Sequence, residues 1–121
     1  MKFFLFNTSI LWTFILLLII QGCGTSKTNI IEQQNEFAIK SAKMGLWNEA
    51  IMRWERIIEI DPKNSKAYNN LGVAYEAKGD LDKAMNAYKK ALELDPNNKA
   101  YLSNYIKFKR NYERSVGDQK N

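Results

Sequence analysis

A repeat of 34 residues constrains the fold of this 121-residue chain more than any other feature of its sequence. Residues of the same type recur in pairs at that offset: Gly45 and Gly79, Ala50 and Ala84, Trp54 and Tyr88, and Asp61-Pro62 and Asp95-Pro96. Between these positions the apolar residues follow helical spacing, so each period predicts two helices joined by a turn. Such hairpins bury their apolar faces by stacking on one another, and the predicted fold class is therefore all-α.

The second copy of the repeat, residues 65–98, carries the pattern most completely. Its spaced aromatic, small and aliphatic positions are Tyr68, Leu71, Gly72, Tyr75, Ala84, Tyr88, Ala91 and Pro96. Gly72 is small where two helices would approach closely, and Pro96 ends the second helix. Gly79 and Asp80 predict the end of the first helix and the N-cap of the second. The pattern resembles the tetratricopeptide repeat (TPR), which implies a short right-handed solenoid of helix-turn-helix units.

The first copy, residues 30–64, is a degenerate version of the same repeat. Phe37 and Ser41 replace the leucine and the second tyrosine of the pattern, whereas Ala38 keeps a small residue for close packing. Terminal repeats are often atypical, because one side has no neighbour. Trp47 and Trp54 lie seven residues apart on one helical face, and we interpret them as packing within the repeat.

The residues after Pro96 predict one further helix. Residues 99–114 continue the helical spacing of apolar residues without a second helix to follow, which is typical of a capping helix with a polar outer face. Residues 115–121 are polar and are expected to form a flexible tail. The predicted architecture is therefore two TPR units plus a C-terminal capping helix.

The first 22 residues predict an export signal. After Lys2, residues 3–20 are apolar apart from four polar residues, which is the order of a secretory signal peptide. A membrane anchor remains open on length, because about 20 apolar residues span a bilayer. Residues 23–29 are small and polar and would connect this segment to the repeats as a short tether.

The only cysteine stands at the end of this apolar segment. Ile20-Gln21-Gly22-Cys23 resembles the lipobox of bacterial lipoproteins, which implies cleavage after Gly22 and attachment of a lipid, with acyl chains such as palmitate, to Cys23. Several acyl chains would hold the protein to a cell membrane or outer membrane, facing the periplasm or the exterior. Two alternatives stay open: a signal peptide without lipid, and an uncleaved anchor with an inert cysteine.

Composition excludes several kinds of chemistry. The chain has no histidine and one cysteine, so it can form no His-based triad, no His-ligated zinc site and no internal disulfide. Asp80 and Asp82 stand where carboxylates cap a helix, and no serine has an apparent base. We therefore predict no enzymatic activity, no catalytic residue, no metal and no cofactor.

The resemblance to the TPR family also implies a partner-binding face. Fixed positions of each first helix meet ligands in that family, and here they include Asn69, Asn70, Val73, Glu76, Asn104 and Lys107. Asn70 and Asn104 hold the same repeat position, and an amide can both donate to and accept from an extended peptide. The alternative is that these asparagines only solvate the surface. The family's clamp for C-terminal carboxylates is incomplete here, and Glu32 and Glu36 oppose it.

These features together predict a membrane-anchored TPR lipoprotein that acts as an adaptor or scaffold in the bacterial cell envelope. Its partner would be a protein or peptide segment of the envelope, and an exported protein has little access to nucleic acid. The alternative is a self-associating subunit of an envelope assembly such as a pilus or secretion apparatus. Two repeats are fewer than the three that stable arrays usually need, so a second copy could cover an exposed helix face.

Overall fold

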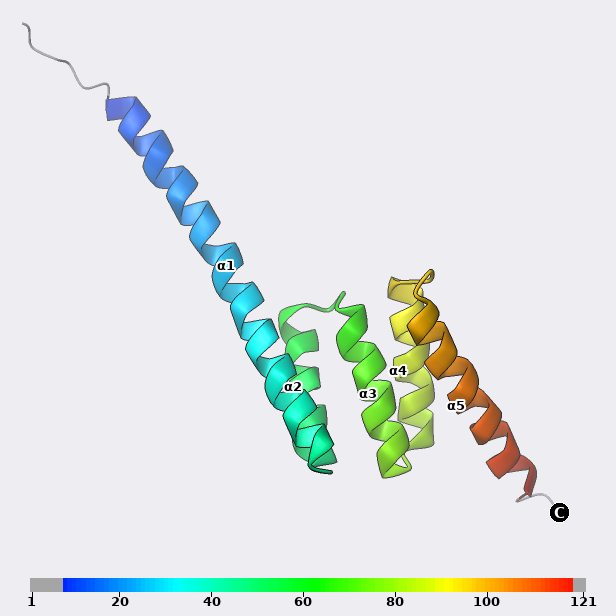
Figure 1. Cartoon of the computed structure of the whole chain (residues 1–121). Helices are drawn as coiled ribbons and strands as arrows, with labels where there is room; N and C mark the ends of the chain where they lie inside the picture. Colours follow the sequence, from blue (N-terminus) through cyan, green and yellow to red (C-terminus); the bar gives the residue numbers. More distant parts are fainter. Residues whose placement is uncertain (1–7, 119–121) are drawn as a thin grey trace, which may run out of the picture.

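The computed structural model describes the backbone of residues 8–118 and the side chains of residues 26–117. The described part of the chain consists of five helices and contains no strand: α1 (Thr8–Lys43), α2 (Trp47–Ile60), α3 (Ser65–Lys78), α4 (Leu81–Leu94) and α5 (Lys99–Asp118). Figure 1 shows two hairpins, α1 with α2 and α3 with α4, followed by α5. The predicted architecture of two helical repeats and a capping helix is thus confirmed.

Local signals set the helix ends of the second repeat. The Asn64 side chain accepts a hydrogen bond from the backbone N–H of Ala67 at 3.0 Å, as an N-cap residue does. Gly79 ends α3 in the left-handed conformation, with φ 78°, as its position predicts. Asp80 precedes α4 as predicted, but its side chain makes no capping bond. It pairs instead with Lys83 at 3.0 Å.

Two helices are longer than the sequence pattern indicates. α1 runs without a break through residues 23–29, the segment expected to be a tether, and α5 continues to Asp118 rather than ending near Arg114. The first proline of the chain is Pro62, so nothing in α1 removes a backbone donor from the helix. The N-terminal half of α1 projects beyond the other helices in Figure 1.

The N-terminal predictions lie largely outside the description. Side chains of residues 1–25 are not described, so cleavage after Gly22 and lipidation of Cys23 remain predictions. Within the described residues, no helix is long and apolar enough to span a membrane.

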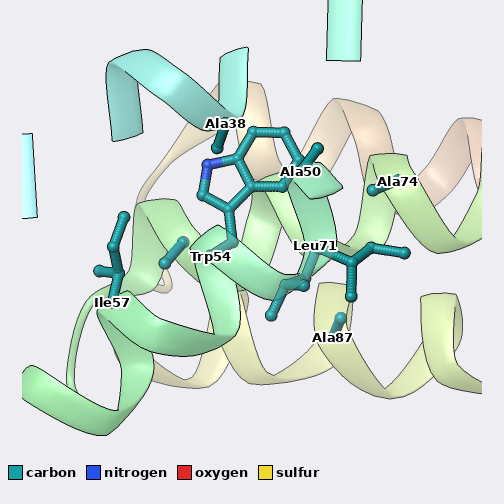
Figure 2. Packing of buried hydrophobic residues seen from close by; sticks show 9 residues of the cluster. Ala38, Ala50, Trp54, Ile57, Leu71, Ala74 and Ala87 are labelled. Carbon is teal, nitrogen blue, oxygen red and sulfur yellow. The ribbon is translucent and has the colours of Figure 1, made fainter. Parts of the chain in front are cut away.

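The larger core cluster forms where α2 meets α1 and α3. Trp54 is 3% exposed and packs among small and aliphatic residues, as Figure 2 shows. The small residues Ala38, Ala50 and Ala74 are fully buried, which lets the helix backbones approach closely around the indole. The prediction that Trp54 packs within the repeat array, and that Ala38 is small for the same reason, agrees with this arrangement.

A second cluster joins α5 to the second repeat. Phe108 of α5 is 1% exposed, and its ring centroid lies 5.4 Å from that of Tyr88 and 5.9 Å from that of Tyr112. Tyr88 in turn packs on Gly72, where a Cβ atom would come within 2.6 Å of its ring. Tyr88 is therefore held between α3 and α5, and this contact fixes α5 on the end of the array.

Candidate functional site

The first helices of the two hairpins and the capping helix form one continuous face. We call the surface formed by α1, α3 and α5 the A-helix face. In Figure 1, α2 lies behind α1 and α4 lies behind α5. Hydrogen bonds join α1 to α3 and α3 to α5 across this face, so the three helices are direct neighbours there. All six side chains predicted to meet a partner belong to α3 or α5 and stand on this part of the fold.

Four asparagines are linked across the A-helix face. Asn104 of α5 donates from Nδ2 to Oδ1 of Asn69 at 3.0 Å, and Asn69 donates to Oδ1 of Asn70 at 3.5 Å. Asn70 donates to Oδ1 of Asn35 in α1, also at 3.5 Å, and the same oxygen accepts from Nε1 of Trp54 at 3.1 Å. We call Asn35, Asn69, Asn70 and Asn104 the asparagine chain. It ties each first helix to the next and orients the amides.

Asn69 differs from the other predicted contact residues. Its side chain is 8% exposed, and both ends of its amide bond neighbouring asparagines. It therefore lies beneath the surface and positions Asn70 and Asn104, which are half-buried. The sequence could not show this, because Asn69 and Asn70 are adjacent and only the packing decides which one turns inward.

A first cavity of about 380 Å³ opens on the A-helix face between α1 and α3. Its apolar lining comes from Ile39, Ala42, Trp47, Trp54 and Val73. Its polar lining comes from Lys43, Lys66 and Asn70. Trp54 is buried and forms part of the floor, whereas Trp47 is half-exposed. The interpretation of Trp47 as packing was thus incomplete, since its ring also faces this cavity.

A second cavity of about 400 Å³ lies between α3 and α5. Four predicted contact residues line it, namely Val73, Glu76, Asn104 and Lys107, together with Ala77 and Tyr88. The hydroxyl of Tyr88 donates to Oε2 of Glu76 at 2.8 Å. Burial first, and then this bond and the charge of Glu76, raise the pKa of Tyr88 above its ordinary value. The hydroxyl therefore stays protonated and holds the carboxylate at the cavity wall.

Val73 joins the two cavities. It lines both of them and is 40% exposed, which is unusual for a large aliphatic side chain at the centre of a helical face. Asn70 borders the first cavity and Asn104 the second. The structure therefore brings five of the six predicted contact residues together along one strip of surface, with Asn69 beneath them.

Charge is distributed unevenly along this strip. Lys43 and Lys66 line the first cavity and Lys107 the second, and none of the three makes an ion pair with any described residue. Glu32 and Glu36 line a further cavity of about 450 Å³ at the α1 edge, which Lys66 also borders. The face thus offers unpaired ammonium groups beside apolar surface, an arrangement that binds carboxylates and apolar side chains together.

No metal site accompanies these cavities in residues 8–118. Within that part of the chain, no group of three or more histidine, cysteine, aspartate or glutamate side chains could hold a metal ion. The arrangement that remains is one of recessed apolar surface, oriented amides and basic side chains. Such a surface can bind an extended chain through its backbone and alternate side chains.

Comparison with known proteins identifies the repeats. The model of the tetratricopeptide repeat matches residues 65–98, and a second TPR model matches residues 42–79. The chain contains tetratricopeptide repeats. The match to residues 65–98 coincides with the second TPR as the sequence predicts it, whereas the first helix of the degenerate repeat lies almost wholly before either match.

Relatives with this repeat include two yeast proteins. Heat shock protein STI1 of Saccharomyces cerevisiae is 48% identical over 54 residues, which are 45% of this chain and 9% of that protein. Small glutamine-rich tetratricopeptide repeat-containing protein 2 of the same yeast is 33% identical over 95 residues, 77% of this chain and 27% of that protein. The chain therefore spans less than a third of the length of these relatives.

A solved structure shows the same fold. The C-terminal TPR-containing domain of an FK506-binding protein from Plasmodium falciparum superposes with a TM-score of 0.68 at 27% sequence identity. The superposition covers 75% of this chain and 60% of that domain. The likeness extends beyond the segments matched by the family models, so the first hairpin and α5 also follow TPR geometry.

Proposed function

We propose that this protein is a membrane-anchored adaptor that binds a segment of another protein on its A-helix face. The observation that carries the proposal is the pair of cavities on that face, which share Val73 and are bordered by oriented amides and unpaired lysines. TPR units supply no reactive group here, and the arrangement suits binding rather than catalysis. The proposed place of action is the bacterial cell envelope.

Anchoring is the second part of this proposal. The lipobox resemblance of Ile20-Gln21-Gly22-Cys23 supports a lipid on Cys23. Removal of the signal peptide after Gly22 would leave a helix from residue 24 to Lys43 between the lipid and the first hairpin. At a rise of about 1.5 Å per residue, this helix would hold the A-helix face at a defined distance from the membrane.

Site-specific photo-crosslinking in cells tests both parts. A photoreactive residue at position 73 replaces an exposed valine at the junction of the cavities, whereas positions 70 and 104 would disturb the asparagine chain. We expect one adduct of foreign mass from position 73 and none from Lys109, an exposed control position on α5 that lines neither cavity. In a Cys23→Ser variant the protein should lose its lipid and the adduct should weaken. Equal adducts from both positions would contradict the binding face.

Self-association is the second candidate, and one observation favours it. Leu102 and Ile106 are exposed by 44% and 47% on α5, one turn apart. Ile106 stands 34 residues after Gly72, whose surface α4 covers in the second repeat, whereas no helix covers α5 in the same way. An adduct of twice the protein's own mass from position 106, with none of foreign mass from position 73, would favour a self-assembling subunit.

A further inference from the structure

The two cavities on the A-helix face are copies of one another under the 34-residue repeat. Corresponding pairs of lining residues are Ile39 and Val73, Ala42 and Glu76, Lys43 and Ala77, Trp54 and Tyr88, Asn70 and Asn104, and Val73 and Lys107. Each cavity therefore has the same aromatic floor position and the same amide at its edge. The repeat supplies one container twice, and only the remaining side chains distinguish what each container accepts.

Those remaining side chains differ in chemistry. In the first cavity Ala42 and Val73 leave the space between α1 and α3 lined mainly by carbon, with no carboxylate among the lining residues. In the second cavity the corresponding positions carry Glu76 and Lys107. An apolar side chain gains about 1.5–3 kcal/mol from burial in the first cavity, whereas the second would leave charged groups desolvated around it.

The charges of the second cavity favour an acidic occupant. Glu76 already accepts a hydrogen bond from Tyr88, and its carboxylate is held against the wall. Lys107 is exposed and makes no ion pair with the described residues, and Arg110 follows one turn later on α5. An incoming carboxylate therefore meets ammonium and guanidinium donors that have no competing partner, which is the condition for a charge-assisted hydrogen bond.

The spacing of the helices sets the spacing of the two groups. Packed helices lie about 8–10 Å apart, and an extended chain advances about 3.3 Å per residue. A segment that crosses α3 from the first cavity to the second therefore covers this distance in about three residues. The asparagine chain lies along the same path and presents the amides of Asn70 and Asn104 to the backbone of that segment.

From this geometry we infer that the A-helix face selects an extended segment with one bulky aliphatic or aromatic side chain for the first cavity and a carboxylate about three residues away for the second. The inference rests on the proposed function, because it takes the A-helix face as the binding surface. It names the chemistry of the partner: an acidic segment with a single apolar anchor. Lys43 and Lys66 at the first cavity favour further acidic residues beside the anchor.

A phage-displayed library of random dodecapeptides tests the inference. The full-length chain is immobilised in detergent micelles, and empty micelles remove phage that bind detergent. We expect enriched peptides to share a bulky apolar residue and an aspartate or glutamate separated by two to four positions, as a crossing of about three residues requires. Enrichment of basic peptides, or of acidic peptides without an apolar residue, would overturn the inference and leave the adaptor proposal to the crosslinking result.

Variants then assign each half of the motif to its cavity. Lys107→Glu should weaken binding of an enriched peptide roughly fivefold, as expected for an exposed ion pair. A peptide whose acidic residue is changed to lysine should recover binding to Lys107→Glu. Lys109→Glu carries the same change in net charge on α5 outside both cavities and should leave affinity nearly unchanged.

The apolar half has its own variant. Ala42→Glu writes into the first cavity the carboxylate that Glu76 supplies to the second. Ala42 is half-exposed on a helix, so the fold should tolerate the change, which circular dichroism checks. Binding should fall by about tenfold or more, since the burial of a leucine-sized anchor is lost. Ala42→Glu and Lys107→Glu effects no larger than that of Lys109→Glu would overturn the inference, whatever the crosslinking shows.

Discussion

Substitution of Gly72 by alanine tests how closely α3 and α4 approach. A Cβ atom at position 72 would lie 2.6, 2.7 and 2.9 Å from three ring atoms of Tyr88. Carbon atoms pack best about 3.5–4.0 Å apart, so the ring or the helix must move by about 1 Å. Tyr88 cannot swing away freely, because Phe108 packs on it and its hydroxyl bonds Glu76.

Two opposing effects set the size of the change. Overpacking of a well-packed core costs about 1–3 kcal/mol, and the short contacts place Gly72→Ala toward the upper part of that range. Alanine regains about 1 kcal/mol of helix propensity over glycine. We therefore expect a net loss of about 1–2 kcal/mol in the free energy of unfolding. In a domain of this size each kcal/mol lowers the melting temperature by roughly 4–8 °C.

Urea denaturation followed by far-ultraviolet circular dichroism measures the loss. Gly117→Ala is the matched control, because nothing lies within 4 Å of its Cβ position and only helix propensity changes. A double variant with Tyr88→Leu removes the ring, and Gly72→Ala should cost less in that background. If Gly72→Ala stabilised the protein as Gly117→Ala does, or if its cost were the same without the ring, the close approach would be refuted.

Three further outcomes follow from the same contacts. Gly79→Ala should cost about 1 kcal/mol in the free energy of unfolding, since φ at this helix end is 78°; thermal melting measures it, and an unchanged melting temperature would contradict the assignment. Asn69→Ala should cost about 1–2 kcal/mol, because it leaves Asn104 without its acceptor; denaturation beside Asn104→Ala, with a double variant that costs no more than either alone, checks this. The raised pKa of Tyr88 means that the unfolded tyrosine ionises first as pH rises, so the free energy of unfolding should be constant below about pH 10 and fall above it. Tyr88→Phe should reduce that alkaline fall, and an equal fall in both proteins would contradict the assignment.

The parts of the fold that a sequence records most directly are the positions where packing allows one residue type. Gly79 must adopt a left-handed conformation, Gly72 must admit the Tyr88 ring, and Ala38 must let two helices approach. Each of these requirements acts within one hairpin, so the 34-residue spacing alone reveals it. The helices, their order and the capping role of α5 follow from these positions.

Contacts between repeats could not be predicted in the same way. The bond from Asn104 to Asn69 joins residues 35 positions apart, and its partners are known only once α3 and α5 are placed side by side. The same placement turns Asn69 inward and Asn70 outward. The lengths of α1 and α5 also escaped the pattern, because polar residues without periodicity predict no helix even where no proline prevents one.

The two copies of the repeat also show where binding specificity resides. Positions that hold each hairpin together keep their residue type from one copy to the next, as in Ala50 and Ala84 or Trp54 and Tyr88, since both hairpins face the same packing problem. Positions that border the cavities change, from Ala42 to Glu76 and from Val73 to Lys107, because they contact space rather than a neighbouring helix. Fold is therefore encoded in the residues that repeat, and partner choice in the residues that fail to repeat. It follows that exchanging the side chains of positions 42 and 76 should alter which segment binds while leaving the helices of both hairpins in place.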